Sequence, residues 1–434
     1  MSEKILLRHE DVPDLRRLEV YERDGGYQAA RKALREIEPL ALVELVKASG
    51  LRGRGGAGFP TGVKWGFLPK DNPKPRYLCV NADESEPGTF KDRQIIELNP
   101  HLLIEGTLLS AYAIQSHTAY IYIRGEFAFG AKVLEEALAE AYAKGHLGRG
   151  IYGTGFDLDV YVHRGAGAYI CGEETGLIES LEGKRAYPRI KPPFPATHGL
   201  FASPTIVNNV ETLACVPAIV SRGADWFKGI GPEKSPGPKL YCVSGHVAKP
   251  GVYELPMGTP LREIIYTHAG GIRNGKGLKA VIPGGSSVPV FTADEIDVAM
   301  DFESVAKAGS LLGSCGIIVM DEDTCMVRAL QIIARFYRHE SCGQCTPCRE
   351  GTGWLEDLLM RLEYGGARPQ DVDLLRRVAD NMIGNTVCVL ADAAAMPVQS
   401  FLSKFRPEFE RHVEAGGCPA HATRPRPVAV AAHA

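Results

Sequence analysis

The stretch YLCVNADESEPGTF, residues 77–90, begins with six residues of strand character and continues into a polar loop. Further alternating segments follow it: a helix at about 101–115, a strand at 118–124, a helix at 130–144 and a strand at 158–163. Strands that alternate with helices of these lengths predict a three-layer α/β domain with a parallel sheet. Ligands of such domains bind beyond the carboxyl ends of the strands, where the loops that start at Asn81 and Gly165 lie.

The rest of the chain divides around this α/β domain. A Pro- and Gly-rich linker at 228–238 leads to the short strands KLYCVSG, GVYELP and LKAVIPGG. Later segments have helical periodicity at 324–338, 349–363, 371–383 and 391–414. We therefore expect a helical N-terminal segment (1–50), the α/β domain (51–230), a small β-rich domain (238–322), a helical bundle (323–415) and a disordered Pro- and Ala-rich tail (416–434).

Composition excludes several classes of protein. The 434 residues, 45% hydrophobic and 23% charged, are typical of about three globular domains. A net charge of -3 gives no long-range attraction to nucleic acid or to an anionic membrane. The longest apolar run, 311–320, is too short to cross a bilayer, and the charged N-terminus lacks the core of a secretory signal. We expect a folded protein in a reducing compartment.

Three cysteines share one short loop, ESCGQCTPCREG. Cys342, Cys345 and Cys348 have C-x2-C-x2-C spacing, which lets three thiolates converge on one iron-sulfur cluster. Cys388 is the favoured fourth ligand, and a helix that follows Cys348 would direct its amide groups toward an anionic cluster. The alternative is zinc, although structural zinc more often uses two paired arms.

Other cysteines compete for a metal. Cys315 and Cys325 are rival fourth ligands, but their neighbours resemble a strand end and a helix start. Cys418 and His421 also suggest a metal pair, which the expected mobility of the tail argues against.

Three glycine-rich loops lie in the α/β domain. The first, GRGGAGFPTG (53–62), has unhindered backbone amides that are suited to a phosphate, but it lacks the G-K-[ST] of nucleotide hydrolases. NADESEPG (81–88) offers amide, carboxylate and hydroxyl groups for a polar ring or a ribitol chain, and GAGAYICGEETG (165–176) repeats this design. A glycine turn and a solvated acidic loop are the structural alternatives.

The sequence resembles the NADH-binding flavoprotein subunit of respiratory complex I (NADH:quinone oxidoreductase), a family of 51 kDa or F-type subunits. The matching segments keep their order: SGLRGRGGAGFPTGVKW, NADESEPG, GAGAYICGEET, NNVET and ESCGQCTPCREG. KLYCVSGHVAKPGVYELPMGT also resembles the β-grasp (ubiquitin-like, SLBB-type) domain of that family. The resemblance implies a Rossmann-like FMN/NADH domain, a β-grasp domain and a C-terminal four-helix bundle that carries the iron-sulfur cluster.

The resemblance also implies cofactors and site residues. It implies FMN, NADH or NAD, and one 4Fe-4S cluster on Cys342, Cys345, Cys348 and Cys388. Flavin contacts are expected at Gly53, Arg54, Gly55, Gly56, Lys64, Asn81, Asp83, Ser85, Gly172, Glu173, Asn208, Asn209 and Thr212. Asn208 and Asn209 also fit as caps of a helix start. Adenine is expected on Phe59, Phe67 and Phe194, the nicotinamide and ribose on Glu86, Glu174 and Lys191, and further cofactor contacts at Glu84 and Tyr169.

The implied activity is that of an NADH dehydrogenase subunit: hydride passes from NADH to FMN, and single electrons pass to the cluster and to partner subunits. The cofactor supplies this chemistry, so no catalytic acid or base is expected. The implied partners are other hydrophilic-arm subunits, notably a small 2Fe-2S thioredoxin-like subunit and a large multi-cluster iron-sulfur subunit, without nucleic acid or direct membrane insertion. The implied location is the cytoplasmic face of a bacterial plasma membrane.

Two alternatives stay open. The diaphorase subunit of an NAD-linked hydrogenase or formate dehydrogenase has the same core, commonly with extra iron-sulfur domains. A zinc-stabilised binding module without flavin would require all three glycine-rich loops to be structural.

Overall fold

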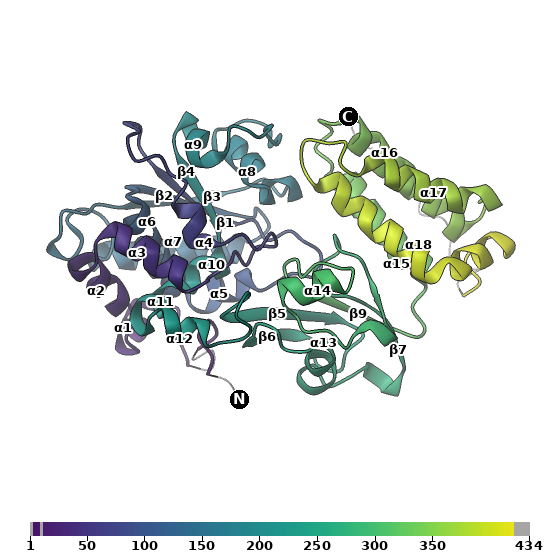
Figure 1. The fold of residues 1–434 in the computed structure, drawn as a ribbon, viewed down its shortest axis with the longest axis horizontal. Coiled ribbons are helices and arrows are strands. Elements are labelled where there is room, and N and C mark those ends of the chain that lie inside the picture. The colour runs from purple at the N-terminus through teal and green to yellow at the C-terminus, as the bar shows by residue number, and fades with distance from the viewer. Residues whose placement is uncertain (1–2, 9–11, 421–434) are drawn as a thin grey trace.

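The computed structural model describes residues 3–8 and 12–420. Three parts lie side by side: an α/β domain, a smaller sheet domain and a bundle of long helices (Figure 1). The sheet domain and the bundle both contact the α/β domain, so the fold gathers loops from all three parts around one region. This α/β, β-grasp and four-helix-bundle architecture confirms the predicted fold class.

The α/β domain is built on a four-stranded parallel sheet in the order β3-β2-β1-β4. Its strands are β1 (Tyr77–Ala82), β2 (Thr118–Ile123), β3 (Asp159–Arg164) and β4 (Thr205–Asn209). The first three match the predicted strands. The interpretation of Asn208 as part of a helix start is wrong, because Asn208 lies in β4 and the helix begins only after Asn209. The sequence has no turn residue there that separates strand from helix.

Helices cover both faces of this sheet (Figure 1). They are α4 (Thr61–Trp65), α5 (Asp92–Leu98), α6 (Pro100–Ile114), α7 (Ala128–Ala143), α8 (Glu174–Leu181), α9 (Pro195–His198), α10 (Val210–Ala214), α11 (Val216–Arg222) and α12 (Ala224–Lys228). The central helix is α6, which is buried on nearly all sides. Its Gly106 permits a close approach, because a side chain there would stand 2.1 Å from the carbonyl oxygen of Leu213 in α10.

The N-terminal segment contains α1 (Leu18–Arg23), α2 (Gln28–Glu36) and α3 (Pro39–Ala48). Their apolar faces join the same hydrophobic core as α6 and the sheet. The preceding amides of Ile5, Leu6 and Leu7 donate to the buried Glu254 carboxylate on the sheet domain at 2.7–3.0 Å. The segment therefore packs as part of the larger body.

The sheet domain has five strands in the order β6-β5-β9-β7-β8. They are β5 (Pro238–Gly245), β6 (Gly251–Pro256), β7 (Leu278–Ile282), β8 (Phe291–Thr292) and β9 (Gly316–Asp321), with helices α13 (Leu261–Glu263) and α14 (Phe302–Lys307). β5 and β9 pair in parallel, whereas the other neighbours are antiparallel. The sequence predicted β5, β6 and β7. It did not predict β9, the central strand within the glycine-interrupted apolar run.

Four helices form the C-terminal bundle: α15 (Met326–Glu340), α16 (Thr346–Tyr364), α17 (Pro369–Met382) and α18 (Leu390–Glu414). Each matches a predicted helical stretch. The bundle core is continuous with Ile282 and Met320 of the sheet domain and with Ile170 of the third glycine-rich loop. This shared core fixes the helix ends relative to the α/β loops.

The described chain extends past α18 in an ordered turn. Cys418 is 4% exposed and its amide donates to the carbonyl oxygen of Glu363 at 2.9 Å. The prediction of a disordered tail from residue 416 is therefore wrong for residues 416–420. His421 lies outside the described residues.

Candidate functional site

The first glycine-rich loop lies against the start of α10. The Arg54 amide donates to Thr212 Oγ1 at 2.8 Å, and a side chain on Gly55 would meet the Asn209 Cβ at 3.1 Å. Asn209 itself caps α10, because its Oδ1 accepts the amide hydrogens of Glu211 and Thr212. The loop therefore presents exposed backbone at the carboxyl end of β4, where ligands of parallel sheets bind.

The Arg54 side chain turns beneath this loop. Its guanidinium group is buried and Nη2 donates to the carbonyl oxygen of Pro236 at 2.6 Å, whereas Nε and Nη1 have no hydrogen-bond partner within the described residues. Its charge contributes to the low pKa of Glu211. The loop thus offers a ligand the backbone of residue 54, while its cation lies in the interior.

The second and third loops meet at the carboxyl end of β1. Asn81 Nδ2 donates to the Gly172 carbonyl oxygen at 2.9 Å, and Ser85 Oγ donates to Asp83 Oδ2 at 2.9 Å. Asp83 Oδ1 is buried and has no hydrogen-bond partner in the part of the chain that the structure describes, and burial raises the pKa of this carboxyl group to about 7. Gly172 packs beside this carboxyl group, because a side chain there would stand 3.6 Å from the Asp83 carbonyl oxygen and 3.7 Å from Asp83 Oδ2. An unpartnered buried acceptor fits a ligand that brings hydroxyl donors, as the ribitol chain of a flavin does.

Glu84 points toward the helix that follows. Its carboxylate accepts the amide hydrogens of Lys91, Asp92 and Arg93 at 2.8–3.1 Å and so satisfies the start of α5. The structure gives Glu84 a capping role in addition to any contact with a cofactor.

Acidic and basic side chains alternate around the start of α8. Glu173 caps α8, since it accepts from the Thr175 and Gly176 amides, and it pairs with Lys191 at 2.7 Å. Glu174 pairs with Lys64 at 2.9 Å and with Lys191 at 3.2 Å. Burial opposes the charge on Glu174, but Lys64 and Lys191 outweigh it and lower the pKa of Glu174. These two glutamates and two lysines therefore offer both acceptors and donors to the polar atoms of a ligand.

Glu86 connects the α/β domain to the other two parts. Its carboxylate accepts from Tyr169 Oη at 2.7 Å and from the Ser287 amide of the sheet domain at 2.8 Å. Burial raises the pKa of Glu86, and these hydrogen bonds oppose the rise. The Tyr169 amide in turn donates to Glu340 Oε2 at 2.9 Å, two residues before Cys342.

Of the three aromatic residues predicted to contact adenine, two lie together. Phe59 and Phe67 flank α4, are about half exposed, and have ring centroids 5.9 Å apart. Phe194 is exposed as well, but among the described residues it has no ring contact with either. Exposed aromatic pairs of this kind suit the stacking of a flat ring.

Asn208 has a different local role from its neighbour. Its Oδ1 accepts from Trp65 Nε1 at 2.8 Å, which ties the end of β4 to α4. It therefore positions the first glycine-rich loop from below, whereas Asn209 faces that loop directly.

A buried cluster of charges, which the sequence analysis missed, supports these loops. Lys91 Nζ lies 2.7 Å from Asp92 and 2.8 Å from Glu211, and Lys239 Nζ lies 2.6 Å from Glu211. Burial opposes the charge on Glu211, but Lys239, Lys91 and Arg54 outweigh it and lower its pKa to about 2. Asp92 Oδ2 also accepts from Asn209 Nδ2 at 2.6 Å. The cluster thereby fixes the cap of α10.

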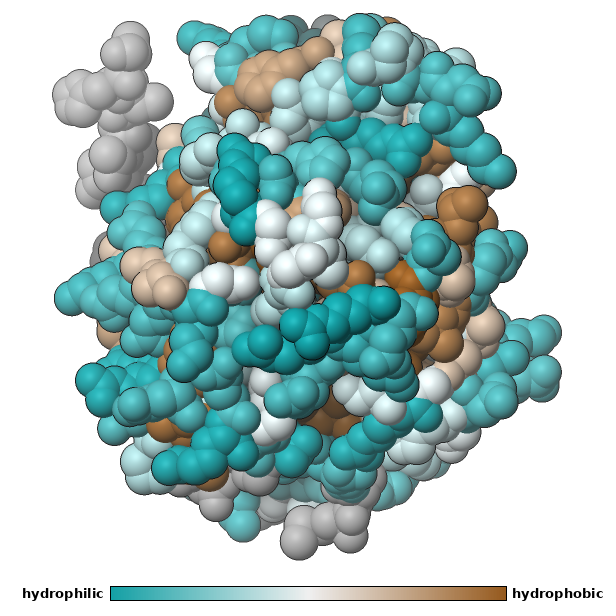
Figure 2. Space-filling view, turned by 90° about the vertical axis from the view of Figure 1, so that its left-hand side faces the viewer, coloured by the Kyte–Doolittle hydropathy of each residue, from teal (hydrophilic) through white to brown (hydrophobic). Residues whose placement is uncertain are grey.

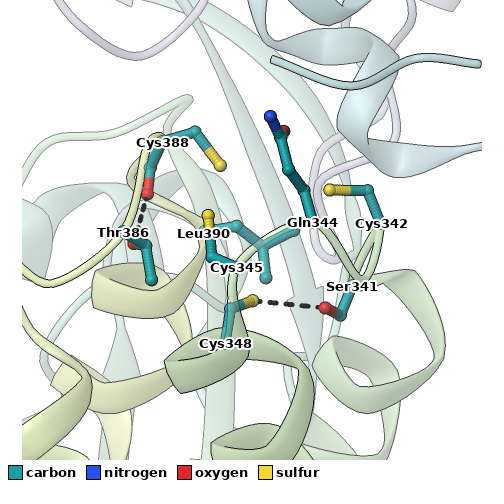
Figure 3. Close-up of a pocket in the computed structure, with 8 residues that line it drawn as sticks. All are labelled: Ser341, Cys342, Gln344, Cys345, Cys348, Thr386, Cys388 and Leu390. Atoms are coloured by element: carbon teal, nitrogen blue, oxygen red, sulfur yellow. Dashed lines mark hydrogen bonds between the residues drawn. The ribbon is translucent and has the colours of Figure 1, made fainter. Parts of the chain in front are cut away.

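The four predicted cluster ligands surround one pocket at the end of the bundle. Cys342 and Cys345 come from the loop between α15 and α16, Cys348 from the first turn of α16, and Cys388 from the loop before α18. The sulfur atoms of Cys342 and Cys388 approach the shared space from opposite sides (Figure 3). The expectation that the helix follows Cys348 needs correction, because α16 already begins at Thr346.

The spacing of these sulfurs bears on the choice of metal. The ligand atoms of a single ion lie within 4.8 Å of one another. In the described chain, no three of the four cysteine sulfurs are this close together. Such spacing fits a multi-atom cluster better than one zinc ion. Burial raises the pKa of Cys388 to about 11, so a bound metal would be needed to hold this side chain as a thiolate.

The surface around the α/β domain is mostly polar, with small apolar groups between charged side chains (Figure 2). Within residues 3–8 and 12–420, no helix combines the length and apolar character that crossing a membrane requires.

Three family models match in the order of the three parts. Residues 46–218 match the Nuo51 FMN-binding domain, residues 239–312 the SLBB domain, and residues 328–412 the NADH-ubiquinone oxidoreductase-F iron-sulfur binding region. Each match falls mainly within one part, although the SLBB match ends before β9 and the FMN-binding match ends within α11.

Similar proteins cover nearly the whole chain. The second F-type subunit of NADH-quinone oxidoreductase from Rhizobium meliloti is 59% identical over 97% of this chain and 100% of its own length. The F-type subunit of the same enzyme from Mycobacterium bovis is 53% identical over 96% of this chain and 94% of its own. A chain of a solved NAD+-reducing [NiFe]-hydrogenase is 37% identical with a TM-score of 0.81, over 95% of this chain and 67% of that one. Because curated relatives this similar match from end to end, the chain belongs to the family of F-type subunits of NADH-quinone oxidoreductase.

Proposed function

We propose that this chain is the electron-input subunit of a membrane-bound NADH:quinone oxidoreductase and that the three glycine-rich loops bind its FMN. The family establishes an NADH dehydrogenase subunit with an FMN-binding domain and a 4Fe-4S region. When bound, FMN accepts a hydride from NADH and releases the two electrons singly. The chain contributes binding, orientation and a route for electrons out of the site.

Each loop has a distinct task in this proposal. The exposed backbone at Gly53, Gly55 and Gly56 contacts the flavin nucleotide beside Asn209 and Thr212. Asp83 accepts ribitol hydroxyls with its unpartnered oxygen, and the adjacent Asn81, Ser85 and Gly172 shape that side. Lys64 and Glu173 lie at the rim.

A second set of side chains would hold the nicotinamide nucleotide. The exposed Phe59 and Phe67 stack its adenine, with Phe194 at the margin. Glu86, Glu174 and Lys191 contact the ribose and nicotinamide portions. Glu84 and Tyr169 act behind this layer, since both are hydrogen bonded to protein groups.

One contact carries the connection between the two redox sites. The Tyr169 amide donates to Glu340, so the third glycine-rich loop touches the segment that begins the cysteine loop. Cys342, Cys345, Cys348 and Cys388 would therefore hold a cluster near the flavin loops, on the route by which electrons would leave toward the bundle.

A cluster held by these cysteines would supply single-electron transfer to other complex I subunits. In our proposal these are a small 2Fe-2S thioredoxin-like subunit and a large multi-cluster iron-sulfur subunit, and the assembly lies at the cytoplasmic face of a bacterial plasma membrane. The diaphorase subunit of a hydrogenase is the alternative. The identity of 59% to an F-type subunit of NADH-quinone oxidoreductase, against 37% to the hydrogenase chain, favours complex I.

Flavin binding to a stripped chain tests the role of Asp83. Asp83→Ala removes an acceptor of charge-assisted hydrogen bonds worth about 1.5–3 kcal/mol, so the dissociation constant for FMN should rise roughly 10- to 100-fold. Asp159→Ala is the matched control, because Asp159 lies at the opposite end of the sheet in β3. Equal FMN affinity in Asp83→Ala and the control would remove Asp83 from the flavin site.

A further inference from the structure

A second group of metal-binding side chains lies outside the flavin and cluster sites. It comprises Cys325, Glu363, His412 and Cys418, whose ligand atoms all lie within 4.8 Å of one another. Cys325 caps the start of α15, Glu363 lies in the last turn of α16, His412 near the end of α18 and Cys418 in the turn beyond it. We propose that these four side chains bind one structural Zn²⁺ ion.

The distances are those of a tetrahedral site. Cys325 Sγ lies 3.3 Å from His412 Nε2, 3.8 Å from Cys418 Sγ and 3.8 Å from Glu363 Oε2, and His412 Nε2 lies 3.8 Å from Glu363 Oε2. With zinc bonds of about 2.3 Å to sulfur and 2.0–2.1 Å to nitrogen or oxygen, neighbouring ligands of a tetrahedron are roughly 3.3–3.8 Å apart. The site thus needs little rearrangement.

The imidazole is already oriented as a ligand. His412 Nδ1 donates to the Glu408 carbonyl oxygen at 2.7 Å, so Nε2 carries the lone pair that faces the thiols and the carboxylate. A backbone carbonyl that fixes the second ring nitrogen is the usual outer partner of a metal-bound histidine.

Burial gives a second reason to expect a cation. Glu363 is 3% exposed, His412 2% and Cys418 4%. Within the described residues, no lysine or arginine forms an ion pair with Glu363, and the nearest nitrogen of a basic side chain is His412 Nε2 at 3.8 Å. A buried carboxylate is costly unless it is paired or binds a metal, and a divalent ion supplies the missing charge.

The chain beyond α18 is shaped to complete the group. Gly416 and Gly417 have φ values of 69° and 146°, which favour glycine and reverse the chain after the helix. The Gly417 amide then donates to the His412 carbonyl oxygen and the Cys418 amide to that of Glu363, both at 2.9 Å. Both thiols therefore reach the same point although 93 residues separate them.

Ligand type and position assign the metal and its role. Two thiolates and one imidazole favour zinc over magnesium or calcium, which prefer all-oxygen sites. The cluster cysteines lie at the other end of α16, about 27 Å away along the helix from Cys345 to Glu363. Zinc has no redox chemistry, so its role is to fasten the ends of α15, α16 and α18.

Metal analysis of the purified full chain, alone or in its complex, tests this proposal. We expect about one zinc per chain in addition to the iron, and zinc absorption fine structure with two sulfur and two nitrogen or oxygen neighbours. His412→Ala and Cys418→Ser should lose the zinc and unfold at lower temperature, with iron, flavin and NADH:ferricyanide activity at wild-type levels. Cys315→Ala, a buried cysteine of the sheet-domain core, should keep the zinc.

Several results would overturn the zinc site. One is a wild-type chain that contains no zinc and takes up none from zinc sulfate under reducing conditions. Another is zinc that persists in both variants, and a third is a Cys325–Cys418 disulfide found by mass spectrometry. The wild-type measurements decide the matter even if a variant does not fold. Loss of flavin or iron with zinc retained would count against the proposed function alone.

Discussion

Replacement of Glu211 by glutamine should destabilise the α/β domain far more than loss of a surface charge. Glu211 is fully buried, pairs with Lys91 at 2.8 Å and Lys239 at 2.6 Å, and accepts the Leu240 amide at 2.8 Å. Glu211→Gln keeps the shape of the side chain but leaves the buried Lys91 with Asp92 as its carboxylate partner, and the buried Lys239 with no carboxylate partner among the described residues. Breaking a buried ion pair in this way costs about 3–5 kcal/mol.

The pKa of Glu211 gives a second estimate of this cost. The pKa is about 2 in the folded chain, against an ordinary 4.5, which corresponds to roughly 3 kcal/mol in favour of the charged folded form. Because the folded value is the lower one, this stabilisation is complete above pH 4.5 and is lost as the pH falls toward 2. The cost of breaking the buried ion pair and the free energy from the pKa of Glu211 are thus both about 3 kcal/mol.

Thermal unfolding of the wild type and the variant measures the effect. For a domain of this size 3 kcal/mol corresponds to a melting temperature lower by about 6–12 °C. The difference should stay constant from pH 5 to pH 8 and narrow below pH 4.5. Asp297→Asn is the control, because its pair with Arg262 is exposed and worth less than about 1 kcal/mol.

Two outcomes would refute this reasoning. One is a melting temperature of Glu211→Gln within about 2 °C of the wild type. The other is a difference from wild type that does not narrow in acid.

Three further predictions concern the site. Cys345→Ser should lose the electron paramagnetic resonance signal of the cluster but keep NADH:ferricyanide activity, because flavin and cluster occupy different parts of the fold; equal loss of both would contradict this division. Glu86→Gln should raise KM for NADH at least threefold, which corresponds to a loss of about 0.7 kcal/mol of binding free energy. Unchanged KM and kcat would exclude Glu86 from the nucleotide site. Asp83→Asn should stabilise the flavin-free chain more at pH 8 than at pH 5. Burial raises the pKa of Asp83 from 3.8 to about 7, so the folded wild type bears the full cost of the buried charge only above pH 7. A melting-temperature gain that is equal at both pH values would contradict this assignment.

Periodicity in the sequence was sufficient for the regular parts of the fold. Strands β1 to β3 and the four bundle helices follow strong alternating or helical patterns, and they lie where those patterns predict them. Strand β4 was missed because its five residues run directly into α10, so no turn residue marks the boundary. Long-range pairing with β1, which a local pattern does not contain, determines its conformation.

The candidate site was predictable where its residues cluster in the sequence. The cysteine loop and the glycine-rich loops are short and recognisable, whereas the buried charge cluster joins Lys91, Glu211 and Lys239 from distant segments. A lysine in a sequence is ordinarily expected at the surface, so its burial follows only from the fold. Cys418 was misinterpreted for a similar reason, because the composition of the tail conceals a turn that packs against α16.

The cofactor content of the purified chain, together with its response to NADH, tests directly whether electrons enter this chain through a flavin. We predict one FMN and four irons per chain, flavin absorption that is bleached by NADH under anaerobic conditions, and iron that is absent when Cys345 is replaced by serine. The opposite result is a properly folded chain that contains no flavin or iron and shows no spectral change with NADH. That result would contradict the proposal that electrons enter at the glycine-rich loops from NADH and leave through the cysteine loop.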